Sequence, residues 1–163
     1  MKTYPEISRV IRKGLSCYVF DKIDGSQIRA EWSRKQGFYK FGTRKRLLGE
    51  DDPLLGEARN LFMLKYEDTL AAIFRMNRWD RAIAFCEFHG ENSFAGLHED
   101  EEHTVTLFDV AYQKKGILSP RDYLKLFGHL DIAKLLHRGN VNAEFIATVE
   151  NGTLPFMTFE GVL

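Results

Sequence analysis

The strongest constraint on the fold is the stretch Arg81–His89, in which the side chains change character at every second position. The even-numbered positions are alanine, alanine, cysteine and phenylalanine, whereas the odd-numbered ones include isoleucine, phenylalanine and Glu87. A period of two is typical of a β-strand whose two faces meet different surroundings. We therefore expect a strand that places Glu87 on a partly apolar face.

Other stretches of the chain favour further strands, because apolar, β-branched and aromatic residues gather in short runs. These runs are residues 18–20, 28–32, 38–41, 104–112 and 156–163. We expect the first two to be joined through the turn at residues 22–27.

Three regions favour helices. The first opens at Pro53 and shows mixed three- and four-residue apolar spacing through about residue 77. The second begins with Ser119 as N-cap and Pro120 in the first turn, and the third runs from Asn142 to Glu150. The core candidates of the first are Leu61, Phe62, Leu70, Ile73 and Phe74. Because strands and helices alternate irregularly, without a repeat or a linker, the sequence predicts an α+β fold.

The composition suits a soluble globular protein of one domain. The chain has 163 residues, of which 44% are hydrophobic and 28% charged. No apolar run approaches the roughly 18 residues that a membrane helix needs. The first residues lack the apolar core of a signal peptide, so we expect a cytoplasmic protein in which Cys17 and Cys86 are reduced. The net charge is zero, which gives no bulk attraction to nucleic acid.

The charge is nevertheless distributed unevenly. Between Ser33 and Gly49 there is no acidic residue, and Phe38, Tyr39 and Phe41 are interleaved with six basic residues. The basic residues are Arg34, Lys35, Lys40, Arg44, Lys45 and Arg46. Basic and aromatic side chains together suit phosphate contact and base stacking. A solvated basic hairpin fits the same pattern equally well.

A lysine lies shortly before a glycine in the motif Lys-Ile-Asp-Gly-Ser, which begins at Lys22. Apolar, strand-forming residues precede this lysine, and Gly25 lets the backbone approach a bound ligand closely. A lysine amine held in such a position can act as a covalent nucleophile once it is deprotonated. A solvated lysine in a turn gives the same short pattern, so the motif by itself does not decide between the two.

Three further motifs follow in the chain. Glu87 lies in Phe-Cys-Glu-Phe-His, Phe108 in Leu-Phe-Asp-Val and Glu160 in Phe-Glu-Gly-Val. Each has a purely structural interpretation, namely a strand-end carboxylate, a core aromatic and a frayed chain end. A flat aromatic face also suits a purine, and a carboxylate can hold Mg²⁺ together with nucleotide phosphates. The order and spacing of the motifs, taken with Lys22, indicate a nucleotide site.

At these four motifs the chain resembles the covalent nucleotidyltransferases, which include ATP-dependent polynucleotide ligases and mRNA capping enzymes. It looks most like the N-terminal adenylyltransferase domain of phage-type RNA ligases, from Lys22 to Glu160. The resemblance implies an ATP-grasp-like fold of two antiparallel sheets flanked by helices, with the nucleotide between the sheets. It also implies ATP and Mg²⁺ or Mn²⁺ as cofactors, and the cytoplasm of a bacterial or phage-infected cell.

The resemblance also implies a role for individual residues. Lys22 matches the lysine that forms lysyl-AMP, and Arg44 matches an arginine that binds phosphate. Glu87 matches the glutamate that contacts the ribose, Phe108 the aromatic that stacks on adenine, and Glu160 the acidic residue linked to the metal. The residues expected beside Lys22 in the nucleotide site are Phe20, Asp21, Ile23 and Gly25.

RNA is favoured over DNA as the polynucleotide by one position. DNA ligases usually carry arginine two residues after the motif glycine, whereas the RNA ligases often carry an amide there, and this chain has Gln27. We expect Gln27, Lys40, Lys45 and Arg46 to contact RNA that has 5′-phosphate and 3′-hydroxyl ends. A DNA ligase, a GTP-dependent capping enzyme and a non-catalytic nucleotide- or RNA-binding module are the alternatives.

The chain departs from the family pattern at its end. The family places a Lys-x-Lys element after the Glu-Gly-Val strand, and this sequence ends at Leu163. We therefore expect residues 1–163 to form a nucleotidyltransferase domain that is truncated before this element. A separate metal site is not expected at His98 and His103, because four carboxylates between two histidines fit no tight tetrahedral pattern and favour a solvated acidic loop.

Overall fold

The computed structural model describes residues 4–5, 14, 16–49, 52, 55–93, 98–113, 115–158 and 160–163. These residues form two antiparallel sheets and three helices, so the α+β prediction is confirmed. The strands are β1 Ser16–Phe20, β2 Ser26–Ser33, β3 Gly37–Thr43, β4 Leu47–Leu48, β5 Arg81–His89, β6 Thr104–Tyr112, β7 Gly116–Ile117 and β8 Leu135–Asn140. The helices are α1 Gly56–Met76, α2 Pro120–Phe127 and α3 Ala143–Glu150.

The large sheet is built around β5. Its strand order is β4-β3-β2-β5-β6-β7, and β5 pairs along its length with β2 and β6. Ala82, Ala84 and Cys86 of β5 are almost fully buried in the core, whereas Glu87 lines a cavity. The predicted alternation is therefore confirmed, and β5 has one core face and one face that carries Glu87.

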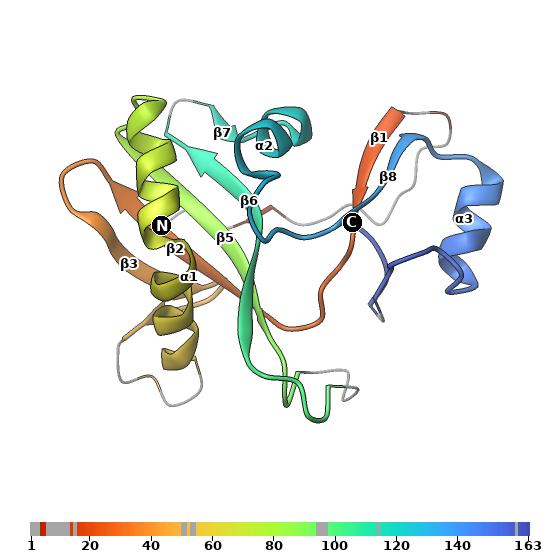
Figure 1. The fold of residues 1–163 in the computed structure, drawn as a ribbon, viewed down its shortest axis with the longest axis horizontal. Helices are drawn as coiled ribbons and strands as arrows, with labels where there is room; N and C mark the ends of the chain where they lie inside the picture. Colours follow the sequence, from red (N-terminus) through yellow and green to blue (C-terminus); the bar gives the residue numbers. More distant parts are fainter. Residues whose placement is uncertain are drawn as a thin grey trace.

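Helix α1 covers the core face of the large sheet (Figure 1). Its buried side chains recur at every fourth position, so that they form one stripe along the helix. The stripe consists of Ala58, Phe62, Tyr66, Leu70 and Phe74. Phe62 meets Phe38 edge-on at 4.9 Å, and Phe74 meets Trp32 at 5.3 Å. Of the core candidates in α1, Leu61 and Ile73 lie at the margin, half-buried.

The predicted helix starts after residue 115 are confirmed. The Ser119 hydroxyl accepts a hydrogen bond from the backbone N–H of Asp122, and Pro120 occupies the first turn of α2. In the same way Asn142 caps α3 by accepting from the N–H of Phe145 at 2.7 Å. Short polar side chains satisfy N–H groups that a helix start otherwise leaves unpaired. Pro53, the expected opening of α1, lies outside the described residues.

Two expectations about strands were wrong. The first two strands do not pair through the turn at residues 22–27, because β1 pairs with β8 in a small two-stranded sheet while β2 belongs to the large sheet. Residues 156–163 do not form a strand in their described part. Phe156 has a left-handed φ of 65° in a turn, and only Val162 forms a β-bridge, with Asp21.

The small sheet is fastened to the large one through the segment 131–133, which leads into β8 (Figure 1). The N–H of Ala133 donates to the carbonyl of Leu107 at 2.8 Å, and Ile132 bridges to Leu107 in parallel. The hydroxyl of Tyr66 accepts from the N–H of Leu107 at 3.1 Å and donates to the carbonyl of Asp131 at 2.5 Å. One buried phenol on α1 therefore joins β6 to the segment that carries the small sheet.

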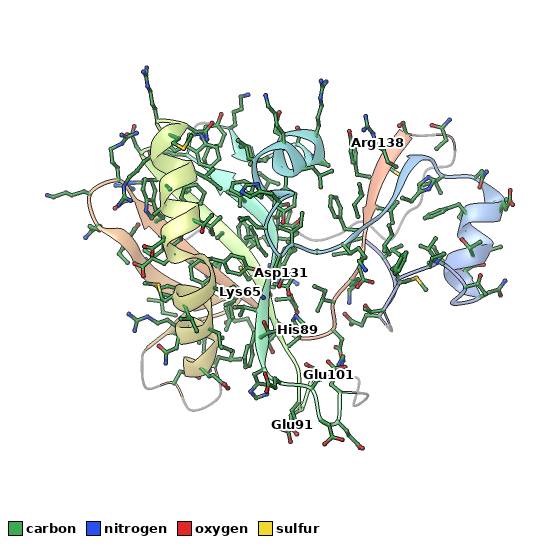
Figure 2. All side chains as sticks on the ribbon, in the orientation of Figure 1. Lys65, His89, Glu91, Glu101, Asp131 and Arg138 are labelled. Atoms are coloured by element: carbon green, nitrogen blue, oxygen red, sulfur yellow. The ribbon has the colours of Figure 1, made fainter. Side chains whose placement is uncertain are left out.

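An ion pair supports the same junction. Figure 2 shows Lys65 of α1 beside Asp131, and their charged groups are 2.5 Å apart. The Lys65 amine also donates to the carbonyl of Val105 at 2.7 Å.

In the part of the chain that the structure describes, no helix has both the length and the apolar character to cross a membrane.

We expect Tyr66→Phe to destabilise the protein by about 1–3 kcal/mol, because it leaves the buried N–H of Leu107 and the carbonyl of Asp131 without their shared partner. Urea-induced unfolding measures this change. Tyr112→Phe is the control, since that ring is half-buried and stacks on Trp79 at 4.5 Å. Equal stability of the two variants would show that the Tyr66 hydroxyl does not hold the junction.

Candidate functional site

A cavity of about 420 Å³ lies between the large sheet and the segments that follow β1 and precede β8. Nine residues that were selected from the sequence line it together, although they come from distant parts of the chain. They are Asp21, Lys22, Ile23, Gly25, Gln27, Arg44, Glu87, Phe108 and Glu160. The wall is completed by Tyr4, Pro5, Ala133 and Leu163. The segment after β1 and the large sheet thus bring the candidate residues into one place.

Backbone hydrogen bonds hold the segment around Lys22 in position. The N–H of Asp21 donates to the carbonyl of Lys134 at 2.9 Å, and the N–H of Lys22 donates to the carbonyl of Gly161 at 3.0 Å. The buried carboxylate of Asp21 accepts from the N–H of Thr158 at 2.8 Å. These hydrogen bonds hold the backbone around Lys22 in place. The Lys22 side chain therefore starts from a fixed position at the edge of the cavity.

Gly25 is required by packing. A Cβ at this position would lie 2.3 Å from the carbonyl oxygen of Phe88, closer than real Cβ contacts come. The absent side chain lets the segment that carries Lys22 lie directly on the end of β5. The glycine of the motif thus brings the lysine near Glu87, which precedes Phe88 in the same strand.

Lys22 and Glu160 form an ion pair across the cavity wall, in which the amine donates to Oε2 of the carboxylate. Both side chains are about one-third exposed, at 35% and 32%. Ion pairs with this degree of exposure stabilise a protein little and exchange partners readily. The pair therefore positions the amine without fixing it permanently.

Glu87 faces the same cavity from β5 in an environment that opposes its charge. Burial, and to a smaller degree the nearby Glu160 carboxylate, raise the pKa of Glu87 to about 8, although the Lys22 amine acts in the opposite direction. A carboxyl group of this kind keeps its proton near neutral pH unless a cation or a hydrogen-bond donor arrives. Perturbed groups that line a cavity are typical of functional sites.

Phe108 occupies a bulge of β6, where the register with β5 shifts, and its ring reaches the cavity. Tyr4 packs against it at 5.2 Å and against Phe85 at 5.1 Å, with both rings edge to face. Sequence reasoning missed Tyr4, because nothing local signals a contact across more than one hundred residues.

Phe20, which was expected in the nucleotide site, is half-buried outside this cavity and meets Tyr123 edge-on at 6.1 Å.

The basic residues divide into two groups. Arg44 lines the cavity, whereas Lys40, Lys45 and Arg46 do not. Arg46 pairs with Asp52, and Lys45 is exposed in the β3–β4 turn. A contact of these last three with RNA stays a prediction.

His98 connects the acidic loop to the lysine motif. One ring nitrogen lies 3.1 Å from a carboxylate oxygen of the buried Asp24, and the other lies 3.0 Å from Glu101. The hydrogen bonds to Glu101 and Asp24 raise the pKa of His98, which favours the imidazolium form. This histidine is therefore held in place rather than simply solvated, a contact that the sequence did not predict.

The described residues contain no group of three or more histidine, cysteine, aspartate or glutamate side chains that could hold a metal ion by themselves. Mg²⁺ needs no such group, because it usually keeps several waters and takes one or two carboxylates together with substrate phosphates. Glu160 offers a carboxylate of this kind at the cavity wall.

The fold is similar to that of an RNA ligase from Naegleria gruberi. A mutant of that enzyme with AMP and Mn gives a TM-score of 0.64 at 15% identity, over 92% of this chain and 46% of that one. A mutant with ATP and Mn and a structure with PPi each give 0.61 at 18% identity, over 84% of this chain and 41% of that one. The chain thus spans less than half of these ligases, and identity this low establishes the fold alone. No family model matches the sequence, and no curated protein matches it significantly.

We expect Glu87→Gln to stabilise the protein at high pH. The pKa of Glu87 rises from 4.5 to about 8 on folding, so stability is lost as pH rises through this interval and stays low above it. The glutamine variant lacks this loss, so its advantage should be absent near pH 4 and reach on the order of a few kcal/mol at pH 9. Urea unfolding across this pH range measures the difference.

Glu144→Gln in the exposed part of α3 is the matched control and should show no such pH-dependent gain. A constant difference between wild type and Glu87→Gln at every pH would contradict the assignment of the buried carboxyl.

Proposed function

We propose that this chain is the adenylyltransferase domain of an ATP-dependent RNA ligase. The observation that carries the proposal is that five residues from distant parts of the chain line one cavity: Lys22, Arg44, Glu87, Phe108 and Glu160. The fold it shares with the Naegleria gruberi ligase, which has been seen with ATP, AMP and Mn, supports the same assignment.

The cavity suits a mononucleotide in size and in the distribution of its side chains. Its volume of about 420 Å³ lies within the roughly 300–1,000 Å³ typical of small-molecule sites. Phe108 offers a flat apolar face for the base, and Glu87 would accept from a ribose hydroxyl. Arg44 would bind phosphate oxygens, since a guanidinium matches them with two parallel hydrogen bonds.

Lys22 would supply the nucleophile. Its Nζ would attack the α-phosphorus of ATP, so that an N–P bond forms while the P–O bond to the β-phosphate breaks and pyrophosphate leaves. The amine must give up a proton and its pairing with Glu160 before it attacks. Arg44 would hold the charge of the leaving group on the way out of the cavity.

Mg²⁺ or Mn²⁺ fits the carboxylate oxygens present here, and Glu160 would hold it together with nucleotide phosphates and water. When bound, such a cation supplies the positive charge that neutralises the phosphates. Glu160 would then exchange the Lys22 amine for a stronger partner, which frees the amine.

The second half of the proposed reaction transfers AMP from Lys22 to the 5′-phosphate of an RNA strand, and a 3′-hydroxyl then displaces AMP to seal the strand. Gln27 lies in the cavity lining beside this route. The exposed basic residues Lys45 and Arg46 lie in the same β3–β4 turn as Arg44 and would contact the RNA backbone.

A non-catalytic nucleotide- or RNA-binding module is the second candidate. It is favoured by the ion pair between Lys22 and Glu160, which occupies the amine in this structure. A GTP-dependent capping enzyme is a weaker alternative. Nucleotide competition would separate it from the others, because only that function predicts GTP as the preferred substrate.

We expect the protein to become radioactive when it is incubated with α-labelled ATP and Mg²⁺, and Lys22→Ala to abolish the label because it removes the attacking nitrogen. The adduct should resist alkali and hydrolyse in acid, as a phosphoramidate does. Lys125→Ala, which changes an exposed lysine on α2, is the control and should label like the wild type.

Equal labelling of wild type and Lys22→Ala would reject the mechanism. Tight ATP binding without label, even at high Mg²⁺ and raised pH, would support the binding module instead. Competition with unlabelled GTP would identify the capping alternative.

A further inference from the structure

Tyr4 separates the main cavity from a smaller one. The second cavity has a volume of about 150 Å³, and Tyr4 and Phe108 line both. Lys22 and Arg44, the candidate phosphate ligands, line only the larger cavity. Asp109 lines only the smaller one. Tyr4 thus lies beside the proposed base-stacking ring, where the two cavities adjoin.

The hydroxyl of Tyr4 donates its proton to a half-buried carboxylate. It donates to Oδ2 of Asp109 at 2.9 Å, while Oδ1 of Asp109 accepts from the N–H of Val110 at 2.8 Å. Burial raises the pKa of Asp109 to about 6, so this group is a carboxylate at pH 8. Burial and the charge of Asp109 raise the pKa of Tyr4 well above its ordinary value, so the phenol keeps its proton.

The ring of Tyr4 is also locked in orientation. Phe85 and Phe108 pack against it edge to face, with interplanar angles of 68° and 83°. A phenol whose single proton is donated can only accept a further hydrogen bond, through its remaining lone pairs. Tyr4 therefore presents a fixed acceptor next to Phe108.

We propose that Tyr4, with Asp109, is a specificity-determining pair that selects adenine over 6-keto purines. This inference rests on the proposed function, because it assumes a purine on Phe108. Adenine carries an amino group at position 6, which can donate to the Tyr4 oxygen. Hypoxanthine and guanine carry a carbonyl oxygen there, which would face the lone pairs of the phenol and leave both acceptors unpaired.

The test compares the binding of ATP and inosine triphosphate at pH 8, measured by calorimetry. The two nucleotides have nearly the same shape and differ in the donor or acceptor at position 6. The wild type should favour ATP, and Tyr4→Phe should reduce that preference about tenfold, because it keeps the ring but removes the acceptor. Tyr39→Phe is a matched control, since Tyr39 also donates to a carboxylate, that of Glu31, but lies outside both cavities.

Asp109→Asn gives a second, independent measurement. The N–H of Val110 requires an oxygen at position 109, so the amide nitrogen of asparagine would face Tyr4 and donate to it. The phenol proton would then be free to donate to a base, and inosine triphosphate should gain affinity relative to ATP. This variant changes the selectivity in a direction that loss of packing would not produce.

The outcomes separate this inference from the proposed function. An unchanged ratio of ATP to inosine triphosphate affinity in both variants, with Lys22 still labelled by ATP, overturns the role of Tyr4 alone. A wild-type protein that binds neither nucleotide overturns both the role of Tyr4 and the proposed function. Thermal unfolding of each variant shows whether it is folded. If Tyr4→Phe does not fold, the nucleotide preference of Asp109→Asn decides whether Tyr4 selects the base.

Discussion

The attachment of residues 131–133 to β6 is the contact on which the site depends. The cavity lies between the large sheet and the segments that join the small sheet to it. Among the described residues, the buried core lies between the large sheet and its helices. The small sheet reaches its place because the backbone of Ala133 and the hydroxyl of Tyr66 both bind to Leu107 of β6. The backbone groups of Ala133 and Leu107 and the hydroxyl of Tyr66 are buried, so several hydrogen bonds are lost at once if the junction opens. The junction that attaches the small sheet to the large one therefore also places the residues that line the cavity.

The electrostatics of the cavity suit an anionic ligand that brings its own counter-ion. Three acidic residues line it, and of these Asp21 is already bound by Thr158. The other two, Glu87 and Glu160, lie there with the basic residues Lys22 and Arg44. In the structure one carboxylate is paired with the lysine, and the other has a pKa near 8 because burial and its neighbour oppose its charge. A nucleotide with a divalent cation would relieve both conditions, because it provides a new partner for Glu160 and a hydroxyl donor for Glu87.

Features that depend on neighbours close in the sequence could be predicted, whereas features that depend on contacts between distant segments could not. The two faces of β5, the N-cap at Ser119 and the start of the third helix near Asn142 depend on neighbours a few residues away, and all were predicted. The division of β1 and β2 between two sheets was not, because strand pairing joins distant segments and leaves no local pattern. The motif residues were found because their types are chemically distinctive. Tyr4 and His98 were missed because an isolated tyrosine or histidine becomes meaningful only when the fold places Asp109 or Asp24 beside it.

The packing of Gly25 gives the motif a second meaning. The position next to the carbonyl of Phe88 leaves no room for even one methyl group. The absence of a Cβ at Gly25 therefore sets how closely the segment that carries Lys22 approaches the strand that carries Glu87. An alanine there would act as a wedge at the base of the cleft and would move Lys22 away from Glu87 without altering either side chain. The glycine works as the spacer that determines how wide the site is.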